Sequence, residues 1–120
     1  EDARLLHITI TEGIWLRIVY LAGALAARSF NDAEPAVLEV TDELFPHNAG
    51  RWRVGPEPAR TDDDADVALD VADLASAYLG AFTFELLAAA GRARELRSGG
   101  LARATALFHT PIPPWCPEGF

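Results

Sequence analysis

The sequence predicts an α+β fold in which a single mostly antiparallel sheet of about five strands carries its helices on one face. Three observations support this prediction. Short segments alternate apolar and polar residues with the period of two that half-buried strands show. Other segments repeat apolar residues at helical spacing. Strands precede most of the helices along the chain, and this order favours an α+β over an α/β arrangement.

Five segments have the composition of strands. Residues 6–11 alternate cleanly, Glu12 and Gly13 interrupt the pattern, and residues 14–19 resume as a more apolar strand that we expect at the sheet centre. The remaining expected strands are residues 37–41, 51–54 and 67–71, with a turn over residues 46–50 and a solvated loop over residues 55–66.

Four helices are expected between and after these strands. An alanine- and leucine-rich run predicts a short helix over residues 21–28. Asp73 is a plausible start for the second helix, which Gly80 interrupts. Thr83 is the expected N-cap of the third helix, and Ser98 that of the fourth, which Pro111 stops.

Composition limits the classes of function. The chain has 120 residues and a net charge of −8, which argues against a nucleic-acid partner and suits a cationic ligand such as an amine. We expect no membrane span, because no apolar run approaches the roughly 20 residues that a spanning helix needs. A single cysteine gives no disulfide framework, which suits the cytoplasm, and no metal site is expected.

Two short motifs invite a ligand interpretation. The aspartates of "TDDDAD" (61–66) resemble a calcium loop, but the sharp-turn glycine and the distal glutamate are missing, so we interpret the segment as solvated loop. The segment "RSGGLA" (97–102) fits the Arg-x-x-Gly-x-Ala pattern of a pyrophosphate loop. Because no clear strand precedes it, we interpret it as a helix cap and reject it as a cofactor site.

Several longer sequence segments identify a protein family more specifically than these two short motifs do. "EGIWLR" (12–17), "ALAAR" (24–28), "LEVTD" (38–42) and "LASAYLG" (74–80), together with the terminal Phe120, occur in this order along the chain. They resemble the C-terminal, sterol-carrier-protein-2-like (SCP2-like) domain of the enhanced intracellular survival (Eis) type of GNAT N-acetyltransferase. The resemblance covers nearly all of residues 1–120, which we therefore treat as one domain. It implies that the GNAT domains lie upstream in the same chain, and the absence of methionine agrees with a piece of a longer protein.

The resemblance also implies roles for individual residues. The terminal carboxylate of Phe120 corresponds to the general base of the family, and Glu12 to an acidic residue that lines the amine pocket. Glu118 stands one step from a position that is acidic in some relatives. The resemblance implies that acetyl-CoA serves the intact enzyme but is not bound by this fragment, and that the acceptor is an amine of the aminoglycoside type. It further implies a homo-oligomer for the intact protein.

Two other functions stay open at this point. The kinship with sterol carriers suggests a lipid-binding domain, which would need an apolar tunnel, and a purely structural assembly domain is the third possibility. The aromatic residues Trp15, Trp52, Tyr78 and Phe82 are expected in the core rather than at a ligand.

Overall fold

The computed structural model describes residues 16–112, in which five strands form one open mixed sheet. The sheet order is β3-β2-β1-β4-β5, and only the contact between β1 and β4 is parallel. The strands are β1 (Ala36–Thr41), β2 (Gly50–Val54), β3 (Ala59–Arg60), β4 (Val67–Asp70) and β5 (Ala93–Glu95). The predicted α+β class and the mostly antiparallel sheet are therefore confirmed.

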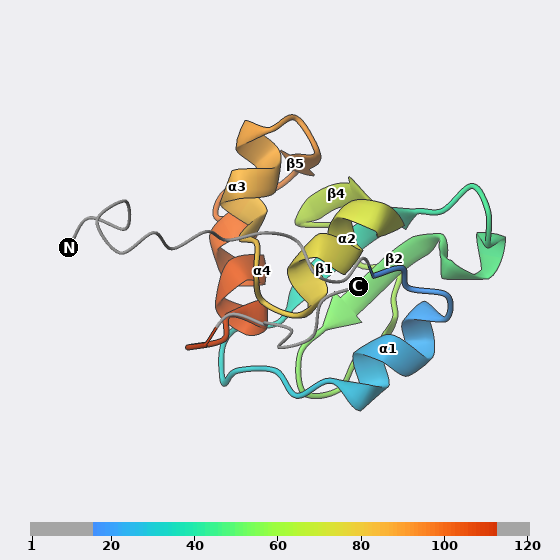
Figure 1. Cartoon of the computed structure of the whole chain (residues 1–120), viewed down its shortest axis with the longest axis horizontal. Helices are drawn as coiled ribbons and strands as arrows, with labels where there is room; N and C mark the ends of the chain where they lie inside the picture. The colour runs from blue at the N-terminus through green and yellow to red at the C-terminus, as the bar shows by residue number, and fades with distance from the viewer. Residues whose placement is uncertain (1–15, 113–120) are drawn as a thin grey trace, which may run out of the picture.

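Four α-helices pack against this sheet (Figure 1). They are α1 (Leu21–Ala27), α2 (Val71–Tyr78), α3 (Phe84–Ala89) and α4 (Gly100–Phe108), and the 3-10 helix η2 (Pro46–Asn48) occupies the predicted turn. The α3 N-cap is Thr83, as predicted, and its Oγ1 accepts from the Leu86 N–H. The other two caps lie elsewhere than predicted: α2 begins after Asp70, whose carboxylate accepts from the Ala72 N–H, and α4 begins after Gly99.

The register of the sheet explains why all the helices lie on one face. Ala36, Leu38 and Val40 of β1 face the helices, and Leu38 stands opposite Trp52 of β2 and Val67 of β4. Most intervening positions of the three inner strands carry polar side chains, such as Glu39, which stands opposite Arg51, whereas Val37 and Ala68 are apolar. The helix-facing side of the sheet is thus apolar and the other side mostly polar, so burial of the apolar side draws the helices to it.

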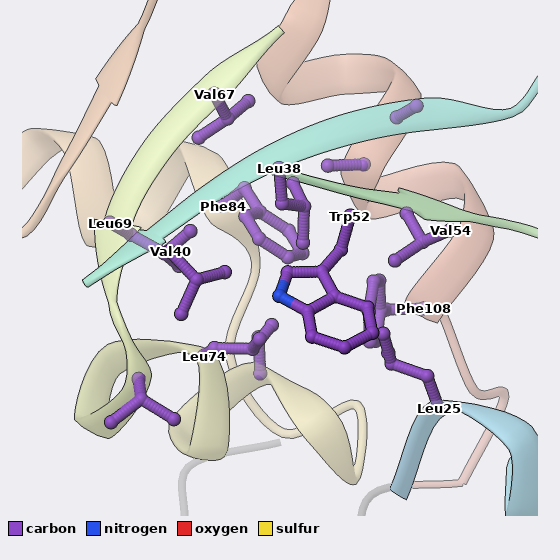
Figure 2. Packing of buried hydrophobic residues seen from close by; sticks show 14 of the residues in the cluster. Leu25, Leu38, Val40, Trp52, Val54, Val67, Leu69, Leu74, Phe84 and Phe108 are labelled. Atoms are coloured by element: carbon purple, nitrogen blue, oxygen red, sulfur yellow. The ribbon is translucent and has the colours of Figure 1, made fainter. Parts of the chain in front are cut away.

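Trp52 lies in the middle of the core, with Leu25, Leu74 and Phe108 around its indole ring (Figure 2). The rings of Phe84 and Phe108 pack with their centroids 5.3 Å apart. The aromatic prediction holds for Trp52, which is 5% exposed, and is wrong for Phe82, which is 43% exposed. Gly80 ends α2 before Phe82, so this ring has left the buried helical stripe.

One of the five predicted strands differs from the structure, and another is not described by it. Residues 16–19 are not a strand, which corrects the prediction for 14–19, and residues 6–11 lie outside the described residues. Two of the five strands in residues 16–112 were not predicted: β3 lies in the predicted loop, and β5 lies in a segment that showed no clear strand pattern. Both are short edge strands, and charged residues at sheet edges hide the alternation that identifies inner strands.

Candidate functional site

The residues predicted to do chemistry lie at the two ends of the chain. Glu12, Glu118 and Phe120 fall outside the described residues 16–112, so their roles stay predictions. The structure does describe the chain that directly follows the Glu12 segment. From residue 16 it runs without regular structure to the start of α1 at Leu21.

A buried carboxylate holds this irregular segment. Asp42 follows the last residue of β1, and its side chain is 1% exposed. Its Oδ1 accepts a hydrogen bond from Nη2 of Arg17 at 2.9 Å, and its Oδ2 accepts one from Nδ2 of Asn48 at 2.9 Å. We call Arg17, Asp42 and Asn48 the Asp42 cluster. The backbone N–H groups of Leu44 and Phe45 also donate to Oδ1, both at 3.0 Å.

The hydrogen-bond donors around Asp42 lower its pKa by more than burial raises it. Burial by itself would raise the pKa of Asp42, because the charged form loses water. Hydrogen bonds from Asn48, the Phe45 N–H, Arg17 and the Leu44 N–H act in the opposite direction, and the pKa falls to about 2. Asp42 is therefore a carboxylate at any pH near neutrality. It acts as a fixed negative charge and not as a proton acceptor.

Asn48 connects the cluster to the core. It is fully buried, and its Nδ2 donates to the Val19 carbonyl at 3.0 Å while its Oδ1 accepts from the Leu21 N–H at 2.8 Å. Its own carbonyl accepts from Nε1 of Trp52 at 2.9 Å. Sequence reasoning missed this residue, since an asparagine inside a predicted turn looks like an exposed turn former.

A second buried carboxylate accounts for the "RSGGLA" segment. Asp66 lies before β4, and its Oδ1 meets Nη2 of Arg103 at 2.8 Å and Nη1 of Arg97 at 3.7 Å. Its Oδ2 accepts from the Val37 N–H at 2.8 Å. We call Asp66, Arg97 and Arg103 the Asp66 cluster. A Cβ on Gly100 would lie 2.4 Å from the Asp66 carbonyl oxygen, so the second glycine of the pair allows this close approach.

The start of α4 carries a carboxylate of this same chain. The Leu101 N–H donates to Oε2 of Glu95 at 3.2 Å, in the position where the pattern would require a phosphate oxygen. The segment therefore has a structural role that joins α4 to β4 and β5. Within residues 61–66, Asp63 pairs with Arg53 at 2.6 Å and Asp66 is buried. Residues 16–112 hold no group of acidic, histidine or cysteine side chains suited to a metal ion.

Arg28, the end of the "ALAAR" segment, joins two helix ends. Its Nε donates to the Tyr78 carbonyl and its Nη2 to the Phe108 carbonyl, both at 2.6 Å, at the C-termini of α2 and α4. The guanidinium also lies over the Phe108 ring, 4.7 Å from its centroid. Burial lowers the pKa of Arg28, and the nearby Tyr78 raises it by less. Cations stabilise helix C-termini, so this arginine has a structural role.

Two surface hollows in the described part of the chain are candidate ligand sites. The larger, of about 450 Å³, is open and polar, and its lining residues are Glu39, Gly50, Arg51, Arg60, Thr61 and Asp62. The smaller, of about 10 Å³, lies between the loop that joins α2 to α3 and the C-terminal end of α4. Neither of these two hollows is an apolar tunnel, and Trp52, Phe84 and Phe108 fill the helix-covered side of the sheet. No helix in residues 16–112 is long and apolar enough to cross a membrane.

Known proteins with similar sequences include bacterial N-acetyltransferases. Curated relatives include an uncharacterized N-acetyltransferase of Streptomyces coelicolor, 44% identical over 125 aligned residues, and the N-acetyltransferase Eis of Mycobacterium tuberculosis, 37% identical over 121. The first alignment covers 100% of this chain and 30% of the relative, and the second covers 93% and 29%. The chain thus spans about 30% of the length of the curated relatives that it matches.

Solved structures of N-acetyltransferases contain a domain with a similar fold. The crystal structure of Eis1 from Mycobacterium abscessus has a TM-score of 0.83 and 41% identity over 87% of this chain and 27% of that chain. A GCN5-related N-acetyltransferase from Anabaena variabilis has a TM-score of 0.72 and 30% identity over 81% of this chain and 26% of that chain. The family model described as "Sterol carrier protein domain" matches residues 21–117. The chain belongs to the sterol carrier protein domain family and is the SCP2-like portion found in Eis-type N-acetyltransferases.

Proposed function

We propose that this chain is the C-terminal accessory domain of an acetyl-CoA-dependent amine N-acetyltransferase, in which it shapes the acceptor pocket and supplies the general base. One observation carries the proposal. The similarity to N-acetyltransferases runs along the whole of this chain while it covers only 30% of the relative. GNAT domains upstream in the same protein would then bind acetyl-CoA.

In the proposed reaction, the carboxylate at the end of the chain accepts a proton from the amine substrate. A cationic amine must lose a proton before its nitrogen can attack the thioester carbonyl, and the carboxylate of Phe120 accepts that proton. The C–N bond forms as the C–S bond breaks, the acylated nitrogen gives up its second proton, and protonation of the leaving sulfur releases coenzyme A as the thiol. An ordinary α-carboxyl has a pKa of about 3.5, and docking into a pocket with little water would raise it toward the range in which a base works well.

The proposed acceptor is a polycationic amine of the aminoglycoside type. Glu12 and Glu118 would attract its ammonium groups, and the net charge of −8 would favour the approach of such a ligand. The prolines of the last ten residues restrict φ, so the tail loses less entropy when it docks. The proposal includes a homo-oligomer and a cytoplasmic location for the intact protein.

Lipid carriage is the weaker proposal. It is favoured by the description of the family model, "Sterol carrier protein domain". The core argues against it, because Trp52 is 5% exposed and lies among Leu25, Leu74 and Phe108 (Figure 2). An acyl chain would have to displace these packed side chains, and closely packed interiors resist such insertion.

The test uses the full-length protein. Acetyl transfer from acetyl-CoA is measured with an aminoglycoside, a polyamine and a neutral alcohol as acceptors, and only the two amines are expected to react. Glu12→Gln should raise the KM for the amine about 10-fold, since an ion pair to the substrate is lost. Glu57→Gln, in the exposed loop before β3, is the matched control and should leave KM unchanged. Absence of transfer to any amine would disprove the proposed activity.

A further inference from the structure

Two segments far apart in the sequence bring exposed side chains together on one surface. The ring centroids of Tyr20 and His47 are 6.1 Å apart, and those of Phe45 and His47 are 5.6 Å apart. Nε2 of His47 lies 3.1 Å from the Val19 carbonyl oxygen, so the two segments lie side by side. Val19, Tyr20 and Leu44 are 55%, 64% and 67% exposed. We call Val19, Tyr20, Leu44, Phe45 and His47 the aromatic patch.

The Asp42 cluster fixes the backbone beneath this patch. Nδ2 of Asn48 donates to the Val19 carbonyl at 3.0 Å. Oδ1 of Asp42 accepts from the backbone N–H groups of Leu44 and Phe45, both at 3.0 Å. Since Asp42 and Asn48 are themselves hydrogen-bonded to each other, both segments of the patch are held by one buried polar network.

Fixed backbone and exposed apolar side chains together suit the aromatic patch to binding. Single exposed apolar side chains are common on protein surfaces, whereas a contiguous group of them marks a site of interaction. Irregular surface segments are usually mobile, and a partner must then order them on binding. Here the buried hydrogen bonds already hold both segments, so docking of a partner costs less entropy.

Two arginines border the patch. The guanidinium of Arg17 lies over the Phe45 ring, 5.0 Å from its centroid, and the Arg17 side chain is 35% exposed. Arg60 is exposed, and its guanidinium donates to the carbonyl of Ala49 at 2.9 Å and to that of His47. Interfaces between proteins have an apolar and aromatic centre with a polar border, and arginine is enriched in them. The composition of the patch and of its border is therefore that of a protein interface.

The size of the patch indicates what kind of partner it fits. An interface between separate proteins uses about 20 to 30 residues on each side, far more than the patch provides. A domain of the same chain needs less contact, because the covalent link keeps its effective concentration at about the millimolar level. The chain spans about 30% of the length of the curated relatives that it matches, so most of such a relative lies outside the aligned part.

We propose that the aromatic patch is the surface on which this domain docks against the acetyltransferase part of the same chain. This inference rests on the proposed function, which puts GNAT domains upstream. The surface that meets the patch is apolar, since Tyr20 and Leu44 offer it mainly hydrocarbon. Docking here fixes the orientation of the domain relative to the part of the protein that binds acetyl-CoA.

Photo-crosslinking in the full-length protein tests this proposal. The photoreactive residue p-benzoylphenylalanine replaces Leu44 in one variant and Leu86 in the matched control. Leu86 is 52% exposed and lies on α3, across the molecule from α1 (Figure 1). Equal amounts of protein with normal and with heavy nitrogen are mixed before irradiation, so mass spectrometry separates cross-links within one chain from those between two chains.

Position 44 should cross-link within one chain to peptides that precede Glu1 in the full-length protein, and position 86 should not. Hydrogen exchange gives an independent readout with Leu44→Asp, which places a charge in the proposed contact. Because Leu44 is largely exposed within the domain, this change should leave the core intact. Exchange of the peptide covering residues 43–47 should speed up about 5-fold as docking weakens, whereas Leu86→Asp should leave that peptide unchanged.

Four results would overturn the proposal. They are cross-links from position 44 that join two chains, cross-links only to residues 1–15 or 113–120, equal cross-linking from position 86, and unchanged exchange in Leu44→Asp. The first would assign the patch to a second copy of the chain, and the second to the domain's own ends. If the full-length protein acetylates amines but position 44 gives no upstream cross-link, this inference fails and the proposed function stands. If it acetylates no amine, the proposed function fails, and the cross-links still show whether the patch is a docking surface.

Discussion

Two buried aspartates lie at opposite ends of β1. They accept the same kinds of hydrogen bond but have different structural roles. Asp42 follows the strand and Asp66 bonds to Val37 near its start, and each accepts from an arginine and from at least one backbone N–H. The Asp66 cluster joins α4 to the sheet and takes up a segment that looks like a phosphate loop. The Asp42 cluster holds the irregular segment before α1. A motif that resembles a ligand site can thus be structural, while an asparagine in a predicted turn can be a buried partner of a distant segment.

The largest effect that the comparison predicts is on stability at the Asp66 end. Asp66→Ala removes two arginine partners and leaves the Val37 N–H unpaired, so the free energy of unfolding should fall by about 3 kcal/mol. Urea denaturation followed by circular dichroism measures this change. Glu39→Gln, which loses only the exposed 4.0 Å contact between β1 and Arg51 of the neighbouring strand β2, should cost less than about 1 kcal/mol. Equal losses in the two variants would show that Asp66 is not a structural centre.

Gly100→Ala should have the next largest effect. The added Cβ meets the backbone of Asp66, which cannot rotate away as a side chain would, so we expect a loss of about 2 kcal/mol. Ser98→Ala, an exposed position two residues earlier, is the control and should change stability by no more than about 0.5 kcal/mol. A melting temperature of Gly100→Ala equal to that of wild type would contradict the close approach of α4 to Asp66.

The contribution of Asp42 to the free energy of unfolding should depend on pH. The pKa of Asp42 is about 2 in the folded protein and 3.8 in the absence of the fold, so its carboxylate binds protons more readily when the chain unfolds. Its stabilising contribution is therefore complete above about pH 4 and is lost as the pH falls to about 2. Asp42→Asn should differ most from wild type near pH 6, and the two urea midpoints should converge at pH 2. A constant difference across this range would contradict the assignment.

The smallest effect concerns the coenzyme. Arg97 lies 3.7 Å from Asp66 and is 60% exposed, and Glu95 already occupies the start of α4. Arg97→Ala in the full-length protein should therefore leave the KM for acetyl-CoA within about twofold of wild type. An increase of more than about 10-fold, measured at saturating amine, would show that the "RSGGLA" segment contacts the coenzyme after all.

Sequence patterns predicted the inner strands and the helices because burial sets their periodicity. Leu38 and Val40 are buried and alternate with the more exposed polar residues Glu39 and Thr41, and this signal is local. The same reasoning fails for residues 16–19, where Leu16 is 45% and Val19 55% exposed while Ile18 is buried. Here side chains distant in sequence supply the hydrogen bonds, and no local pattern records that Asn48 will reach residues 19 and 21.

The candidate site could be predicted only in part for a similar reason. Asp42 is the last residue of the "LEVTD" segment, which carries the family resemblance, but nothing in composition or spacing pointed to its burial or to its pairing with Arg17. The edge strand β5 escaped notice because Arg94 and Glu95 are charged, as edge strands often are. Contacts between segments far apart along the chain set these features, and one sequence does not display them.

The most direct test of the proposed function moves the terminal carboxylate without removing the Phe120 ring. One alanine added after Phe120 in the full-length protein shifts the carboxylate by up to about 3.5 Å. If that group is the general base, kcat should fall at least about 100-fold, while Phe120→Ala, which keeps the terminal carboxylate, should lose clearly less. A kcat near that of wild type in the extended protein would show that the terminal carboxylate is not the base.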